Sequence, residues 1–225
     1  MTKFRKMVRA AVIAALIGAA ALGLSGGIAA ATVYGDPVDA AQYWVQQNLD
    51  DCSLMATADV VGQLTGRQPS EPEIVHLAGV TPSAHHDGPV YLPPSDPDDP
   101  DSGRGTDSRD LPILLAHYGI HSVYTDDDVA DEVGVPTGLT SLAIALAAGH
   151  KVIAGVNAET IWDIDGDRSI GNHDLVVTAI DTDAGVVHLN DSGTEDGADE
   201  QVSIATFERA WQASDHDMVV ALVAA

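Results

Sequence analysis

Residues 46–58 of the chain read Gln46-Gln47-Asn48-Leu49-Asp50-Asp51-Cys52-Ser53-Leu54-Met55-Ala56-Thr57-Ala58. The two aspartates suit the N-terminus of a helix, and apolar residues then recur at three- and four-residue spacing as far as Gly66, a typical helix end. We therefore predict a helix that carries Cys52, the single cysteine of the chain, in its first turn. Unpaired backbone N–H groups at a helix N-terminus favour an anion, so this position suits a nucleophilic thiolate.

The first 31 residues have the pattern of a secretory signal. Basic side chains among residues 3–9 precede an uncharged stretch rich in Ala, Leu, Ile and Gly, which ends in three alanines at residues 29–31. We expect cleavage after Ala31 and a secreted or extracytoplasmic protein without stable membrane association. The alternative is an uncleaved N-terminal anchor. A lone thiol in an exported domain cannot form an internal disulfide, which favours a reactive role for Cys52.

The charge of the remaining chain narrows the range of partners. Residues 32–225 hold six basic and 34 acidic side chains, a formal charge of −28. Nucleic acid is excluded as a partner, because a polyanion needs a basic surface. The length suits one domain with a substantial core. We expect a monomer that acts on a peptide or protein substrate.

Local patterns predict an α+β fold. Helices are expected over 71–79, 109–118 with Ser108 as its cap, 139–148 and 204–212, and strands over 120–124, 151–156, 175–180, 186–189 and 218–223. Residues 32–44 read as an extended lead-in, and the Pro- and Asp-rich segment at about 82–107 as a disordered surface loop. Because helices come first and antiparallel strands follow, we predict N-terminal helices packed on a C-terminal antiparallel sheet in one domain, 32–225.

A base and an orienting group for the thiol are found on the predicted hairpin. Of nine histidines, His173 directly precedes the strand at 175–180, and Asp191 follows the strand at 186–189. The start of the first strand and the end of the second are neighbours in a hairpin, so His173 and Asp191 are expected to meet as general base and orienting residue. The side-chain amide of Gln46, together with the Cys52 backbone N–H, is a candidate donor to an oxyanion.

These residues and spacings resemble the bacteriocin-processing type of papain-like cysteine peptidase, family thirty-nine, in its stand-alone exported form. The motifs are Gln46-x5-Cys52, Leu146-x2-Gly149-His150-Lys151-Val152-Ile153, His173-x3-Val177-Thr178-x-Ile180-Asp181, Val187-x-Leu189-Asn190-Asp191-Ser192-Gly193 and Phe207-x3-Trp211, which together cover about residues 42–222. The resemblance implies a papain-like fold and a thiol hydrolase. In it Cys52 is the nucleophile, His173 the base, Asp191 the orienting residue and Gln46 the oxyanion donor.

The chain departs from the family pattern at three positions. Ser53 follows the cysteine where the family usually has Gly, and Ser192 stands where it has Pro. His173 is followed by Asp174 instead of a small or apolar residue, so a carboxylate adjoins the base and can alter its titration. None of the three departures removes a predicted catalytic group.

Other interpretations remain open at the level of sequence. Asp51-Cys52-Ser53 also resembles NlpC-type cell-wall peptide hydrolases, although these place the histidine much nearer the cysteine. Residues 163–174 resemble a calcium loop, but Arg168 stands where such a loop needs Gly, so a plain polar loop is favoured. A catalytically silent peptidase-like binding domain is the third possibility. We expect no cofactor and no metal, since one cysteine and scattered histidines show no ligand spacing.

Overall fold

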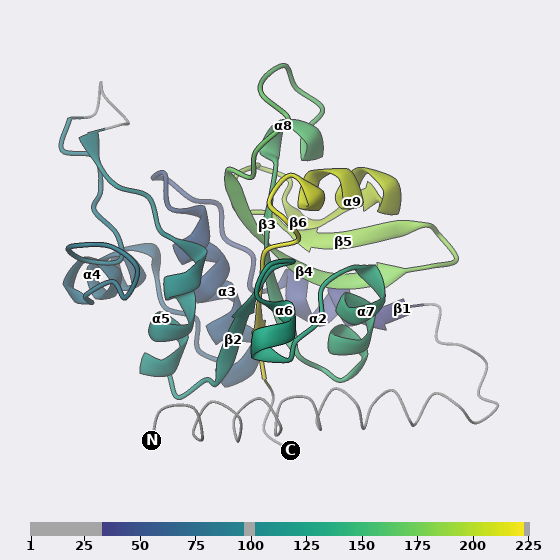
Figure 1. Ribbon diagram of the computed structural model, residues 1–225, viewed down its shortest axis with the longest axis horizontal. Helices are drawn as coiled ribbons and strands as arrows, with labels where there is room; N and C mark the ends of the chain where they lie inside the picture. Colours follow the sequence, from purple (N-terminus) through teal and green to yellow (C-terminus); the bar gives the residue numbers. More distant parts are fainter. Residues whose placement is uncertain (1–32, 97–101, 223–225) are drawn as a thin grey trace.

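The computed structural model describes residues 33–96 and 102–222 (Figure 1). The predicted signal over residues 1–31 lies outside the described residues. Within the described ranges, no helix has both the length and the apolar character that crossing a bilayer requires.

The centre of the protein is a seven-stranded antiparallel sheet. Its strand order is β2-β7-β3-β4-β5-β6, and β1 pairs with β4 outside this path. The strands are β1 (Val33–Gly35), β2 (Ser122–Thr125), β3 (Lys151–Val156), β4 (His173–Asp181), β5 (Val186–Asn190), β6 (Ala198–Ser203) and β7 (Met218–Ala221). The predicted hairpin is confirmed, because β4 and β5 are antiparallel neighbours with Val176 opposite Asn190.

The helices begin and end at the signals that the sequence carries. Helix α3 starts at Cys52 with Asp51 as N-cap and ends before Gly66, whose φ of 73° is the left-handed conformation that glycine adopts readily. Helix α4 has the predicted capping box of Ser70 and Glu73. The helices are α2 (Pro37–Ala41), α3 (Cys52–Thr65), α4 (Glu71–Val80), η2 (Ser108–Asp110), α5 (Leu111–His117), α6 (Ala130–Val133), α7 (Leu139–Ala147), α8 (Ala158–Ile161) and α9 (Ile204–Gln212).

Helices cover both faces of the sheet (Figure 1). Helices α3, α4 and α5 form one core with side chains such as Ile153 and Val176, whereas α7 and α9 form a second core with their chain neighbours Val152 and Val177. Adjacent residues of one strand therefore point to opposite cores, as the period of two dictates. The predicted α+β class, with helices first and an antiparallel sheet after them, is confirmed.

Several local expectations need correction. Residues 33–41 form β1 and α2 instead of an extended lead-in, because Asp36 caps α2 and Pro37 suits its first turn. Before α5, Asp107 and not Ser108 provides the cap, of the short helix η2, which leaves the Ser108 hydroxyl available elsewhere. The described parts of 82–107 contain no α-helix and only the isolated β-bridges Pro82–Pro89 and Leu92–Arg104, but this segment is not confined to the surface, since Val90 and Tyr91 are buried in the core.

Candidate active site

Cys52 is the first residue of α3 and lies at the mouth of a cleft. The Asp51 carbonyl accepts hydrogen bonds from the backbone N–H groups of Leu54 and Met55 and so starts the helix immediately before the thiol. The backbone N–H of Asp174 donates to Cys52 Sγ at 3.5 Å. The helix N-terminus and this amide both direct positive partial charge at the sulfur, which stabilises negative charge there.

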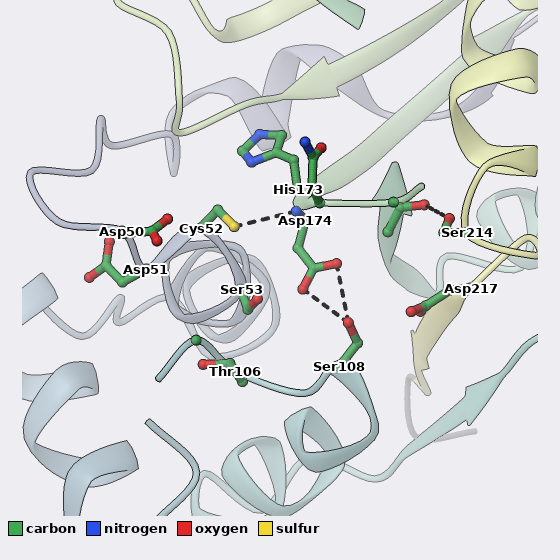
Figure 2. A pocket seen from close by; sticks show the side chains of 14 residues that line it. Asp50, Asp51, Cys52, Ser53, Thr106, Ser108, His173, Asp174, Ser214 and Asp217 are labelled. Atoms are coloured by element: carbon green, nitrogen blue, oxygen red, sulfur yellow. Dashed lines mark hydrogen bonds between the residues drawn. The ribbon is translucent and has the colours of Figure 1, made fainter. Parts of the chain in front are cut away.

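The sheet brings His173 and Asp191 together as the hairpin predicted. His173 is the first residue of β4 and is paired with Val156 of β3, and Asp191 directly follows β5. His173 Nε2 lies 2.7 Å from Asp191 Oδ1, and the two side chains are 5% and 0% exposed. With Nε2 engaged by the carboxylate, Nδ1 is left for the thiol. Figure 2 shows the ring of His173 on the same side of the β4 start as the Cys52 sulfur.

Two further groups fix the Asp191 carboxylate. Trp162 Nε1 donates to Asp191 Oδ2 at 2.9 Å, and the backbone N–H of Gly193 donates to Asp191 Oδ1 at 2.8 Å. The Trp162 ring also packs against the His173 ring, with centroids 5.1 Å apart. Sequence reasoning missed Trp162. A tryptophan in a chain with only three, close before the candidate base, was the available signal.

The electrostatics of the pair favour an imidazolium. Burial alone would lower the pKa of His173, but the hydrogen bond to Asp191, the hydrogen bond to Cys52 and the charges of both raise this pKa well above its usual value. Burial would raise the pKa of Asp191, but the hydrogen bond and charge of His173, with the Trp162 and Gly193 donors, lower it instead. A positive His173 beside an ionised Asp191 suits a thiolate partner.

Gln46 is the one exposed residue among the four predicted site residues. It is exposed in the segment between α2 and α3, and it is not among the described residues that line the cleft. Its neighbour Gln47 is anchored instead, because its backbone N–H donates to the Ser192 carbonyl at 2.9 Å and its Oε1 accepts from the Ser192 hydroxyl at 2.8 Å. Ser192, one of the departures from the family pattern, thus holds the segment that leads to Cys52.

The cleft beside the thiol has an empty volume of about 680 Å³, open solvent included. It is bounded by Cys52 and His173 together with twelve further residues, namely Asp50, Asp51, Ser53, Gly105, Thr106, Ser108, Gly155, Gly171, Asn172, Asp174, Ser214 and Asp217. Ser53 and Asp174, the other two residues that depart from the family pattern, are in contact in this cleft, where the Ser53 hydroxyl hydrogen-bonds the Asp174 carboxylate. The Ser108 hydroxyl lies 3.3 and 3.2 Å from the two oxygens of Asp174, as Figure 2 shows.

A buried amide connects α3, the helix that carries the thiol, to β5, the strand that Asp191 directly follows. Asn190 Nδ2 donates to Asp59 Oδ2 on α3 at 2.7 Å and to the carbonyl of Ala40 on α2 at 2.9 Å. Gln63 Nε2 also donates to the other oxygen of Asp59. These contacts fix α3 relative to β5, and therefore Cys52 relative to Asp191.

The loop that resembles a calcium site is organised by its own side chains. Arg168 Nη2 donates to Asp163 Oδ1 and to the Ile164 carbonyl, and the Asp167 carboxylate accepts from the backbone and hydroxyl of Ser169. Asp174, the last position of the calcium pattern, points into the cleft instead. Over the residues that the structure describes, no cluster of three or more His, Cys, Asp or Glu is arranged to hold a metal ion.

Three mycobacterial proteins are similar to the chain over nearly its whole length. It is 49% identical over 226 residues to the uncharacterized protein Rv1268c of Mycobacterium tuberculosis H37Rv, with 97% of each chain covered. The match is equal for the uncharacterized proteins MT1306 of M. tuberculosis CDC 1551 and Mb1299c of Mycobacterium bovis. The chain belongs to the family of these mycobacterial proteins. No protein-family model matches it.

Two solved structures were found to be similar to this chain. The crystal structure of a putative C39-like peptidase from Bacillus anthracis superimposes with a TM-score of 0.53 at 18% identity, over 81% of this chain and 94% of that one. At this identity the likeness shows a C39-like peptidase fold and no more. A double glycine motif protease from an AMS/PCAT transporter, solved with its leader peptide, is more distant, with a TM-score of 0.44 at 12% identity over 80% of this chain and 89% of that one.

Proposed function

We propose that the protein is an exported cysteine peptidase or amidase, in which Cys52 is the nucleophile, His173 the general acid and base, and Asp191 the residue that orients the imidazole. The observation that carries the proposal is the buried pair of His173 and Asp191, 2.7 Å apart, because His173 lines the same cleft as the thiol at the start of α3. A binding domain has no physical need for a buried imidazolium aimed at a thiol.

The chemistry follows from these positions. The Cys52 thiolate attacks the carbonyl carbon of a peptide bond, a C–S bond forms, and the carbonyl electron pair moves to oxygen. Backbone N–H groups at the α3 N-terminus stabilise this oxyanion, and Gln46 remains a predicted donor that would have to turn inward. The His173 imidazolium gives its proton to the leaving nitrogen as the C–N bond breaks. His173 then takes a proton from water, which attacks the thioester and releases the acid and the free thiol.

Thiol labelling tests the proposal directly. We expect iodoacetamide to label Cys52 rapidly at neutral pH in the native protein, and about 100-fold more slowly in His173→Ala, because an activated thiolate reacts far faster than a thiol. The matched control is His117→Ala, which removes an exposed histidine at the end of α5 and should leave the rate unchanged. Equal, slow labelling of the native protein and His173→Ala would refute the enzymatic proposal.

Hydrolysis separates the remaining alternatives. A peptide library incubated with the native protein and with Cys52→Ala should show cleavage only with the native protein. Rapid labelling without cleavage of any peptide or muropeptide would indicate a peptidase-like binding domain. Cleavage of muropeptides alone would favour a cell-wall peptide hydrolase of the NlpC kind. Export is tested by the N-terminal sequence of protein recovered from the culture medium, which should begin after Ala31.

A further inference from the structure

The cleft is strongly acidic on both sides of the thiol. Its lining includes the carboxylates of Asp50, Asp51, Asp174 and Asp217, and no lysine or arginine is found among the described residues that line it. Figure 2 shows Asp50 and Asp51 to the left of Cys52, Asp217 to the right, and Asp174 between the thiol and Asp217. Carboxylates that are spread along a groove, with no compensating cation, attract a positively charged ligand.

Two of these carboxylates have oxygens that are buried without a donor. The Asp51 side chain belongs to a residue only 2% exposed; its carboxyl group lies beside the Glu71 carboxylate, and neither of its oxygens accepts from an N–H group among the described residues. Asp217 Oδ1 is likewise buried and without a partner there. A buried polar atom without a partner is costly, so such atoms at a site call for a ligand that donates hydrogen bonds.

The structure also holds Asp174 and Asp217 close together. Ser108 contacts both carboxylates, and Gly155 lies beneath them. A Cβ added to Gly155 would lie 3.1 Å from Asp217 Oδ2 and 3.3 Å from Asp174 Oδ1, so the missing side chain makes room for the two acids at the floor of the cleft. An ammonium or guanidinium group bridges two such carboxylates well.

We propose that this cleft selects peptides with a lysine or arginine side chain close to the bond that Cys52 attacks. The inference rests on the proposed function and adds the chemical class of its substrate. Asp174, which replaces the residue usual in the resembling family, adds a carboxylate to this cleft that the resemblance alone does not predict, and Ser53 hydrogen-bonds this carboxylate.

The titration of the acids agrees with this inference. Burial, and next the charge of Asp174, raise the pKa of Asp217 to about 8. Burial, and next the charge of Glu71, raise the pKa of Asp51 to about 7. The empty cleft therefore retains protons at neutral pH, and a bound cation releases them as it takes their place.

A set of matched peptides tests the inference without requiring turnover. In the first set, one lysine is placed at each position of an alanine hexapeptide in turn; in the second set, norleucine replaces this lysine. Each peptide is then tested for its ability to protect Cys52 from iodoacetamide in about 0.15 M salt. We expect at least one lysine peptide to protect at an about tenfold lower concentration than its norleucine partner, as suits a charged hydrogen bond. General attraction to the acidic surface would instead be independent of position.

Variants assign the effect to the cleft. The preference for lysine should fall to about twofold or less in Asp217→Asn or in Asp51→Asn, two substitutions at opposite ends of the cleft. The matched control is Asp215→Asn, which makes the same substitution at an exposed residue outside the cleft lining and should keep the full preference. Retention of the full preference in both cleft variants would overturn the assignment.

Failure of this inference differs from failure of the proposed function. Lysine peptides that protect no better than norleucine peptides, while labelling still depends on His173, would overturn the basic specificity and leave the thiol hydrolase intact. Slow labelling that does not depend on His173 would overturn the proposed function, and the inference with it.

Discussion

His173 Nε2 lies 2.7 Å from Asp191 Oδ1, and a second histidine of the same hairpin, His188, lies 2.6 Å from Asp199 Oδ1 through its Nδ1. The geometry of the two contacts is similar, but their surroundings differ. The first pair is buried beside the thiol, whereas His188 and Asp199 are 11% and 34% exposed and neither lines the cleft. The pair of His188 and Asp199 therefore serves as an internal control for the role of His173 and Asp191.

Asp191→Asn tests the orienting role. The amide keeps the size of the side chain but removes the charge that holds His173 as an imidazolium, so we expect thiol labelling at neutral pH to slow by about 100-fold. Asp199→Asn makes the same change in the second pair and should leave the labelling rate within about twofold of the native rate. An equal effect of the two variants would mean that charge near the hairpin, and not the His173 contact, sets the rate.

Trp162→Phe tests a positioning role for the indole N–H. Phenylalanine retains a ring against His173 but loses the hydrogen bond to Asp191, so we expect activity to fall about tenfold, as for the loss of about 1.5 kcal/mol. Without that donor Asp191 becomes a stronger acceptor for the imidazolium, and the alkaline limb of the pH–rate profile should move to higher pH. A merely structural loss would lower the rate at all pH values without moving the limb.

The sequence was most informative where local signals agree with the tertiary structure. The run from Asp51 to Gly66 carries its own cap, apolar spacing and stop, and α3 follows it closely. The strands at 175–180 and 186–189 are apolar and joined by a short turn, so their pairing, and with it the meeting of His173 and Asp191, follows from local pattern alone. Such features need no knowledge of distant contacts.

The parts that sequence reasoning missed depend on distant contacts. Trp162 is the C-cap of α8 and donates to Asp191, a contact that no periodicity in the sequence reveals. The polar strand β6 is held by its pairing with β5 and has no apolar alternation to announce it. Asp217 joins the cleft only because β7 pairs with β3, which brings the residue before β7 next to Gly155. Tertiary contacts decide all three positions.

Asn190→Ala tests the connection between α3 and β5. The substitution leaves the buried Asp59 oxygen and the Ala40 carbonyl without their donor, so we expect urea denaturation to show a loss of about 1–3 kcal/mol. Asn48→Ala is the matched control, because Asn48 makes an exposed hydrogen bond to Glu71 and should change stability by no more than about 0.5 kcal/mol. Similar losses in the two variants would contradict the role assigned to Asn190.

Stability should fall as pH rises from about 5 to about 8.5, because burial raises the pKa of Asp59 to about 6, of Asp51 and Glu200 to about 7, and of Asp217 to about 8. An unfolded carboxyl ionises near pH 4, so between that value and the folded pKa the native state binds protons that the unfolded state has lost, and the stability they give disappears as pH rises. The raised pKa of His173 acts in the same direction, since its contribution is complete below about pH 6.5 and is lost on deprotonation. We expect Tm in calorimetry to drop by at least about 4–8 °C over this range, the shift that corresponds to about 2 kcal/mol in a chain of this length. The Asp217→Asn side chain is neutral at every pH, so this variant should show a smaller drop in Tm. A Tm of the native protein that is constant or rises from pH 5 to 8.5 would refute the assigned protonation states.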